Sequence, residues 1–195
     1  MPNHVMNKVT FHNIKTKEEK DYILNMVAKY ETDGWKFDFN KIIPEPITED
    51  ECPEDCKVNK DSHVMEDKDR PWFDWYAWRN KYWNTKWGAY ECCTTISDNE
   101  IIFEFQTAWS FARPIAYKLH LLGFDFTWEF ADEDFGSNCG ITRYDQYIGY
   151  HYYNGAELGE DPTRFAMTLW GYDEEEIEDY FKEIEEDKEK WKGVE

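Results

Sequence analysis

The sequence predicts an α+β fold in which an antiparallel sheet carries helices on one face. Segments that alternate polar and apolar residues, as half-buried strands do, recur through roughly the first 130 residues, and segments with an apolar stripe at helical spacing lie between them. Aromatic residues make up 18% of the 195 residues, which is enough to fill a sizeable core. At this length the chain forms one large domain or one domain with insertions.

The first two predicted elements are a strand and a capped helix. Residues 5–11 alternate and place Val5, Asn7, Val9 and Phe11 on one side. Thr16 begins the helix as its N-cap, and Glu19, three residues later, completes a capping box. The helix is expected to run to about Tyr30 and to end at Asp33-Gly34. Its buried stripe is formed by Ile23, Met26, Val27 and Tyr30.

A second strand is predicted over residues 35–43, where aromatic and polar side chains alternate until Pro44-Glu45-Pro46 stops the pattern. Residues 47–70 carry almost no core-forming side chains and predict an exposed insertion. This insertion contains three potential zinc ligands, Cys52, Cys56 and His63. Their loose spacing and acidic surroundings favour the interpretation without a metal.

Residues 71–90 hold five of the ten tryptophans and are the richest window in large apolar surface. Pro71 suits the first turn of a helix, where its missing N–H costs nothing. One helical face is formed by Trp72, Trp75, Tyr76, Arg79 and Trp83. We interpret the segment as a plug that closes the core and leads into a loop over residues 84–88. The alternative is a stacking surface for bases, which normally needs basic neighbours.

Two further strands, over residues 89–96 and 100–107, are joined by Ser97-Asp98-Asn99 and predict a hairpin. Their buried side carries Ile101, Phe103 and Phe105. The helix that follows is expected to be capped by Ser110, with Pro114 in its first turns and Gly123 at its end. Its core stripe is Ile115, Leu119 and Leu122. Residues 124–130 alternate again, and the resulting order of elements is a ferredoxin-like split βαβ.

The last part of the chain predicts one or two strands over residues 141–153, a loop over residues 155–163 and a helix from Asp173. The side chains of this helix expected to face the body are Ile177, Phe181, Ile184, Lys188 and Trp191. We divide the chain into a ferredoxin-like domain at 1–155, with an insertion at about 44–88, and a C-terminal extension at 156–195 that carries the acidic helix.

The charge balance is strongly negative, because 22 Lys and Arg stand against 42 Asp and Glu, a formal net charge of -20. Such a surface repels phosphate, so we expect no direct binding of nucleic acid and a basic protein as partner. The first ten residues have no apolar run that would form a signal peptide, and no window predicts a membrane span. Five cysteines, an odd number, favour free thiols in a reducing cytoplasm.

The residues that catalysis needs do not form a recognisable pattern. The five histidines are scattered without metal spacing, and a glycine-rich phosphate loop is missing from the sequence. Cys92-Cys93 falls in a predicted strand, where inert packing is the expected role. Asp132 and Asp134 could hold a divalent cation, but an EF-hand loop needs more ligands. We therefore expect a protein that is not an enzyme and uses neither cofactor nor metal.

Four short stretches carry a resemblance to a known family. They are Met1-Pro2-Asn3-His4-Val5 with Asn7, Phe39-Asn40-Lys41-Ile42-Ile43-Pro44, Trp83-Asn84-Thr85-Lys86-Trp87, and Thr107-Ala108-Trp109-Ser110. Together they resemble the YubB-type ferredoxin-like domain family of phages and conjugative plasmids, over roughly residues 1–140. The chain departs mildly from the family at residues 111–114, where a proline-rich turn is usual. The resemblance implies no residue roles, only a mobile-element setting, in which small acidic proteins often inhibit host defence.

The leading functional prediction is a phage or plasmid counter-defence protein. It would act as an acidic nucleic-acid mimic on the nucleic-acid site of a host defence complex, such as CRISPR-Cas or a nuclease, in the host cytoplasm. The prediction rests on eleven carboxylates between Asp173 and Glu189, which could pair with the Arg and Lys that normally hold phosphates. The predicted partner-binding residues are Glu174, Glu175, Glu178, Glu185, Glu186 and Glu189.

Two alternatives stay open. The first is a binder of a small nucleotide signal, in which Lys86 and Arg113 would contact phosphate beside an aromatic pocket. The aromatic members of that pocket would be Trp83, Trp87, Tyr90 and Trp109. The second is a non-catalytic accessory protein whose acidity only aids solubility.

Overall fold

The computed structural model describes residues 3–58, 68–145, 149–154, 157 and 159–192. Six of its strands form one antiparallel sheet, in the spatial order β4 (Tyr90–Ile96), β5 (Ile101–Ala108), β1 (His4–Phe11), β6 (Phe126–Asp132), β7 (Cys139–Asp145) and β8 (Gly149–Asn154). The predicted α+β class and the antiparallel sheet are confirmed. The tyrosine-rich segment at 141–153 supplies two strands of this sheet.

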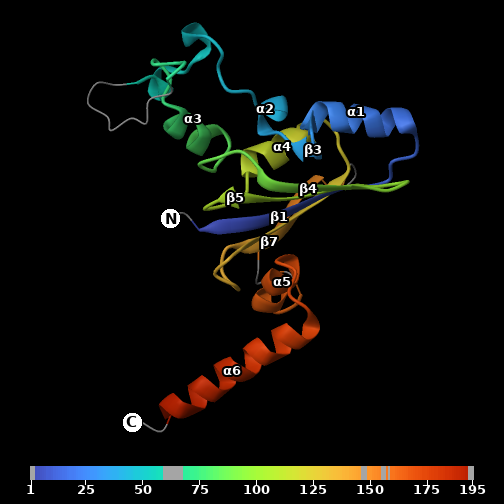
Figure 1. Ribbon diagram of the computed structural model, residues 1–195, viewed down its shortest axis with the longest axis vertical. Helices are drawn as coiled ribbons and strands as arrows, with labels where there is room; N and C mark the ends of the chain where they lie inside the picture. The colour runs from blue at the N-terminus through green and yellow to red at the C-terminus, as the bar shows by residue number, and fades with distance from the viewer. Residues whose placement is uncertain (1–2, 59–67, 146–148, 155–156, 158, 193–195) are drawn as a thin grey trace.

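Helices lie on both faces of the sheet. α1 (Lys17–Val27) and α4 (Arg113–Leu121) cover one face, as expected, and enclose the main core with Val5, Val9 and Phe11 of β1 (Figure 1). α5 (Pro162–Leu169) covers the other face and closes a small second core there. The two helices of the predicted split βαβ therefore share one face, as expected, whereas the helix on the other face, α5, is not predicted.

The first helix has the predicted capping box but ends earlier than predicted. The Glu19 N–H donates to the Thr16 hydroxyl at 3.1 Å, and the Glu19 carboxylate accepts the Thr16 N–H at 3.2 Å. The chain becomes extended at Ala28 and forms β2 (Ala28–Glu31), which pairs with β3 (Gly34–Phe37). The hairpin turn is formed by Thr32-Asp33, so Asp33-Gly34 does not end a helix, and Tyr30 is 70% exposed rather than buried.

The strand predicted over residues 35–43 stops at Phe37. The Asp38 side chain accepts the Asn40 N–H at 3.0 Å and caps the short helix α2 (Phe39–Ile42). A helical turn brings Phe39 and Ile42 to the same side, so both are buried, which continued alternation would not achieve.

The tryptophan-rich segment forms α3 (Trp75–Tyr82), which begins after Asp74 and not at Pro71. The Asp74 side chain caps it by accepting the Ala77 N–H at 2.9 Å. The segment does plug the core, as interpreted, but through a different set of rings. The fully buried or nearly buried rings are those of Phe73, Trp78 and Trp83, whereas Tyr76 of the predicted face is exposed.

The insertion before α3 is partly packed, contrary to the prediction that it is exposed. Two short 3-10 helices, Glu49–Glu51 and Glu54–Cys56, fold back onto α3. They bury Cys52 and Cys56 in the main core. His63, the third ligand of the zinc alternative, lies outside the described residues. Among the residues that are described, no three His, Cys, Asp or Glu side chains are arranged to hold a metal ion.

The N-cap position of α4 is Ala112 and not Ser110, and no side chain caps the helix there. Pro114 lies in the first turn and Gly123 ends the helix at a φ of +81°, as predicted. Ile115 and Leu119 are fully buried. Leu122 follows the last helical residue and is 41% exposed, so it does not extend the core stripe.

α5 was not predicted, and its first residues were assigned to a loop. The Asp161 side chain caps it, and Phe165 and Ala166 pack on Ala131 and Cys139 of the sheet. It links the sheet to α6 (Glu174–Lys192), the predicted acidic helix.

α6 contacts α5 at its start and then projects away from the sheet (Figure 1). Of its predicted stripe, only Ile177 is buried; Phe181 and Ile184 are half-buried and Lys188 is exposed. The Trp191 side chain lies outside the description. Within the described residues, none of the helices combines the length and apolar composition that a membrane crossing requires.

Candidate functional site

Three segments that are distant in sequence meet where β1 begins and β5 ends. They are the start of β1, the loop over residues 84–88 and the turn at Trp109. The Trp109 N–H donates to the Asn3 carbonyl at 2.9 Å, and the Asn138 side chain donates to the Trp109 carbonyl at 3.0 Å. These bonds hold Trp109 at a φ of +74°, uncommon for a bulky residue, while its side chain stays 38% exposed.

The loop is tied to the Trp109 turn by side-chain hydrogen bonds. The buried Thr85 hydroxyl donates to the Ala108 carbonyl at 2.8 Å and accepts the Ala108 N–H at 3.1 Å. The Asn84 amide donates to the Ser110 hydroxyl at 2.9 Å, and that hydroxyl donates to the Asn84 carbonyl at 2.7 Å. Ser110 is therefore used to join the two segments, which explains why it does not cap α4.

A buried network of polar side chains in β1 and β5 is hydrogen-bonded to this junction. Asn7, fully buried in β1, donates to the Val5 carbonyl at 2.8 Å and to the Thr107 hydroxyl at 2.9 Å, and accepts the Trp128 indole N–H at 3.0 Å. The Thr107 hydroxyl in turn donates to the Ser110 carbonyl at 2.8 Å. Every side-chain hydrogen-bonding group of Asn7 thus has a partner, which the low local dielectric makes important.

Lys86 lies in an aromatic surface at this junction. Its ammonium nitrogen is 4.8 Å from the centre of the Trp87 ring and 5.7 Å from that of Trp109, both within cation–π range. Tyr76 of α3 meets Trp109 edge to face at 6.0 Å, and Tyr90 meets Trp87 in the same way at 6.0 Å. We call Tyr76, Trp87 and Trp109 around the Lys86 ammonium the indole clamp.

His4 and Tyr90 form a hydrogen-bonded pair beside the clamp. The His4 Nδ1 atom is 2.6 Å from the Tyr90 hydroxyl, which also donates to the Thr107 carbonyl at 3.2 Å. Burial, with smaller effects from the Glu133 and Glu91 carboxylates, raises the pKa of Tyr90 to about 12. Tyr90 is therefore a neutral hydrogen-bonding group at physiological pH, not an acid or base.

The residues of the predicted nucleotide pocket are divided between different places. Lys86, Trp87 and Trp109 come together in the clamp, next to Tyr90. Trp83 belongs to the core, is 1% exposed and donates its indole N–H to the Ile43 carbonyl at 2.9 Å. Arg113 stands at the exposed start of α4. The predicted set thus does not form one pocket around Trp83.

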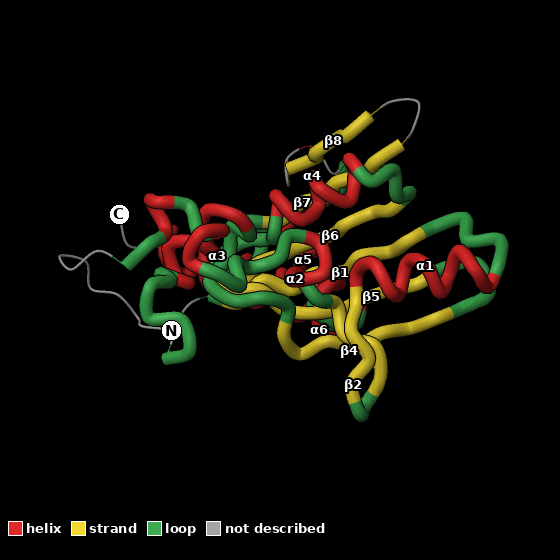
Figure 2. The backbone as a smooth tube through the Cα atoms, turned by 90° about the horizontal axis from the view of Figure 1, so that it is seen from above, coloured by secondary structure: helices red, strands yellow, loops and turns green. Residues whose placement is uncertain are grey.

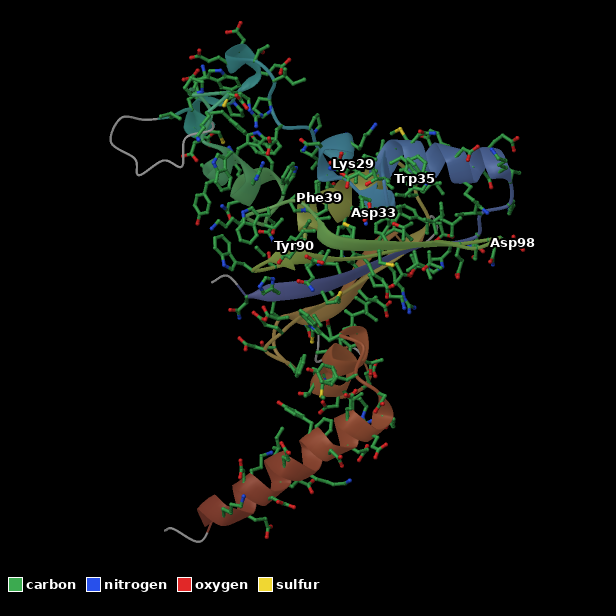
Figure 3. The ribbon with its side chains drawn as sticks, in the orientation of Figure 1. Lys29, Asp33, Trp35, Phe39, Tyr90 and Asp98 are labelled. Atoms are coloured by element: carbon green, nitrogen blue, oxygen red, sulfur yellow. The ribbon has the colours of Figure 1, made fainter. Side chains whose placement is uncertain are left out.

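A cavity of about 560 Å³ lies between the β2–β3 hairpin, α3 and β4. Figure 3 labels Lys29, Asp33, Phe39 and Tyr90 around it. Its cations are already paired: Lys29 with Glu31 at 2.8 Å and Lys36 with Asp33 at 2.9 Å, while Arg79 pairs with Glu45. An anionic ligand would have to displace those carboxylates. Two further lining residues are Trp83 and Tyr90 of the predicted pocket.

Sequence reasoning missed this cavity because it missed the hairpin that walls it. Figure 2 shows the β2–β3 hairpin beside β4, where the Lys36 ammonium donates to the Cys92 carbonyl at 2.8 Å and the Thr94 hydroxyl to the Trp35 carbonyl at 2.6 Å. The available signal was Asp33-Gly34 between two short alternating segments, because Asp and Gly are turn-forming residues; Asp33 ends the hairpin turn and Gly34 begins β3.

The predicted carboxylates of α6 fall into two groups. Glu174 and Glu178 form ion pairs with Arg164 of α5, whose guanidinium also lies over the Phe181 ring at 5.5 Å, so these two acids help to attach the helix. The hydrogen bonds that the Arg164 guanidinium donates to Glu178 and Glu174 raise the pKa of Arg164. The other four are exposed and form no ion pair within the described part of the chain: Glu175, Glu185, Glu186 and Glu189.

The carboxylates of the acidic turn after β6 accept hydrogen bonds from side-chain and backbone amides. The Asp132 carboxylate accepts hydrogen bonds from the Asn3 and Asn138 side chains, at 3.3 and 3.1 Å, and from the Asp134 N–H at 3.0 Å. The Asp134 carboxylate accepts a second bond from Asn3 at 2.7 Å. This turn therefore braces the start of β1 rather than presenting a ring of free oxygens to a cation.

Comparisons of the chain with family models, with curated proteins and with solved structures gave no match.

Proposed function

We propose that the protein is an acidic inhibitor that occupies the nucleic-acid site of a basic host protein. The observation that carries the proposal is α6, which leaves the body (Figure 1) and whose carboxylates are exposed along its length. A chain of net charge -20 favours a basic partner by electrostatic attraction and steers its approach.

The spacing of these carboxylates supports mimicry of a nucleic-acid strand. The six predicted side chains fall within one side of the α6 helix, since successive residues turn by about 100°. They span the sixteen residues from Glu174 to Glu189, or about 22 Å at 1.5 Å per residue, which averages one carboxylate about every 4.5 Å. One DNA strand carries a phosphate about every 3.4 Å. The row is not uniform, because Glu174 and Glu178 pair with Arg164, and Lys182, which pairs with Asp179 at 2.8 Å, lies between Glu178 and Glu185.

The proposed setting is a phage or conjugative plasmid, with the partner a CRISPR–Cas complex or nuclease in the host cytoplasm, and with no catalytic role for this chain. It rests on the resemblance to the YubB-type family. The order β4-β5-β1-β6, with α1 following β1 and α4 joining β5 to β6, supports the ferredoxin-like arrangement of that family. Three of the four stretches that carry the resemblance also meet at the indole clamp.

The test begins by capturing a partner from host lysate and identifying it by mass spectrometry. Its affinity for the whole chain is then measured at low and high salt and in competition with duplex DNA. An acidic variant carries Gln at Glu175, Glu185, Glu186 and Glu189, which form no ion pair with any other described residue. The matched control removes four other exposed charges, at Glu18, Glu49, Asp50 and Asp98.

Mimicry predicts that the α6 variant binds at least tenfold more weakly, which is about 1.4 kcal/mol, while the control changes little. It also predicts that salt weakens binding steeply and that DNA competes with the chain. Equal losses in both variants would show that only net charge matters. Affinity that is insensitive to salt and DNA would contradict the proposal.

A second candidate is a binder of a small nucleotide, favoured by the cavity in which Lys29, Lys36 and Arg79 line the same space as Trp83 and Tyr90. Mass spectrometry of ligand released from the purified chain, with a thermal-shift screen of nucleotides, tests it. A shift that Lys36→Met abolishes would support the site. The absence of both retained ligand and shift would contradict it.

A further inference from the structure

The indole clamp holds a cation without a carboxylate. Among the described residues the Lys86 ammonium forms no ion pair, although acids outnumber bases by 42 to 22 in the chain. Two ring faces, of Trp87 and Trp109, hold it instead. The arrangement therefore demonstrates which kind of group the surface accepts, because an indole face attracts a cation through its quadrupole.

The clamp is rigid and open to solvent. The Trp109 N–H donates to the Asn3 carbonyl, and the Trp109 carbonyl accepts a hydrogen bond from the Asn138 side chain. The neighbouring loop is fixed by the bond from the Thr85 hydroxyl to the Ala108 carbonyl. The Trp109 and Tyr76 side chains are nevertheless 38% and 41% exposed. Rigid, exposed aromatic side chains lose little entropy on binding, and such residues dominate the energetics of protein interfaces.

Acidic groups flank the clamp. Asn3, whose carbonyl accepts the Trp109 N–H, donates its side chain to Asp134, and Glu133 accepts the His4 N–H at 2.9 Å. Glu133 and Asp134 are both exposed. This neighbourhood disfavours a phosphate and complements a cation. In Figures 1 and 2, α6 extends toward the side on which β1 begins.

We propose that the indole clamp receives an arginine side chain of the basic partner, which replaces Lys86 between the rings; this inference rests on the proposed inhibitor function. A guanidinium is planar, stacks on aromatic faces and pairs with carboxylates through two parallel hydrogen bonds, whereas an ammonium is a compact, strongly hydrated charge. The clamp therefore selects arginine over lysine, and α6 supplies attraction that does not discriminate between them.

The experiment titrates the full chain with an octa-arginine peptide and with an octa-lysine peptide of equal charge. Lys86→Met empties the clamp, and Lys86→Arg fills it with an internal guanidinium at unchanged net charge. Trp109→Gly removes one ring at a backbone conformation that glycine accepts without strain. Tyr76→Ala, at an exposed helical position, is a second ring variant, and thermal melting confirms that each variant is folded.

We expect the wild type to prefer the arginine peptide, with a preference of about two- to fivefold for each ring that takes part. Lys86→Met should strengthen arginine binding more than lysine binding. Lys86→Arg and Trp109→Gly should each reduce the preference. The α6 variant with four glutamines should weaken both peptides alike and leave the preference intact.

The proposal is overturned if the wild type shows no preference, if Lys86→Arg binds like the wild type, or if Lys86→Met strengthens both peptides equally, as charge alone requires. Weaker arginine binding by Lys86→Met would also overturn it, because Lys86 would then support peptide binding instead of competing for the rings. A lost preference with an intact α6 effect rejects the clamp and keeps the inhibitor proposal. An intact preference without any α6 effect rejects α6 mimicry and keeps the clamp.

Discussion

Replacing Asn7 by Ala is the change that should test the buried network beneath the candidate site most directly. Asn7 is fully buried and makes three hydrogen bonds, two as donor to the Val5 carbonyl and the Thr107 hydroxyl and one as acceptor from the Trp128 indole. Alanine removes all three and leaves the Trp128 N–H without its partner in the core.

The expected cost follows from these contacts. Three intramolecular hydrogen bonds contribute about 0.5–1.5 kcal/mol each, and a stranded buried donor costs about 1–3 kcal/mol, so we expect a loss of about 2–4 kcal/mol. For a chain of this length, each kcal/mol lowers the melting temperature by about 2–4 °C. The predicted decrease is therefore about 5–15 °C.

Urea unfolding and thermal melting measure the loss, with Asn25→Ala as the control. Asn25 is exposed on α1 and donates to the Asp21 carbonyl at 2.7 Å, so its loss should cost under about 0.5 kcal/mol. A cycle with Trp128→Phe should show a coupling of about 1–2 kcal/mol, because the two side chains share one bond. If the double variant loses the sum of the two single losses within about 0.5 kcal/mol, the two side chains are not coupled and the reasoning is refuted. An Asn7→Ala variant as stable as the Asn25→Ala control would refute it as well.

Three further predictions follow from burial and attachment. Trp83→Ala, at a site that is 1% exposed, should lower the free energy of unfolding in urea by about 3–5 kcal/mol. Trp87→Ala, at a half-buried site, should lower it by about half as much. The reverse order would contradict the placement of the two rings. Burial raises the pKa values of Cys56 and Cys92 from 9.0 to about 11. The stability of the protein should therefore fall between about pH 9 and 11, because the unfolded thiols lose their protons first. In thermal melts across this pH range, a variant with Ala at both sites should show a smaller decline. Arg164→Gln should change the melting temperature by under about 2 °C, because the ion pairs of Arg164 are exposed. The same change should speed amide hydrogen exchange in α6. Unchanged exchange would show that these ion pairs do not attach the helix.

Local patterns in the sequence predicted the elements whose packing and capping agree. Alternation at residues 5–11 predicted β1, because its buried side matches the face that the helices cover. The capping box at Thr16 predicted the start of α1, and Gly123 the end of α4, since both depend on bonds within a few residues. The α+β class followed from these elements.

The failures occurred where contacts distant in sequence decided between local options. Helical spacing extended to Tyr30, but Ala28 pairs with Phe37 and joins the core as a strand instead. Ser110 is a good N-cap by type, yet the loop at Asn84 takes its hydroxyl. The sequence grouped Lys86, Trp87 and Trp109, but it could not predict the conformation of Trp109, because Asn3 and Asn138 impose it from other parts of the chain.

Charge and shape have separate tasks in the proposed mechanism, and the structure separates them in space. α6 carries its carboxylates on a helix attached mainly by Ile177 and the Arg164 pairs, so it can contribute long-range attraction but little geometric discrimination. The clamp is held by many short bonds and offers a defined geometry over a small area. An inhibitor that relied on α6 alone would bind many basic proteins, whereas one that relied on the clamp alone would bind weakly. Selectivity for one partner therefore requires both surfaces to act on the same molecule.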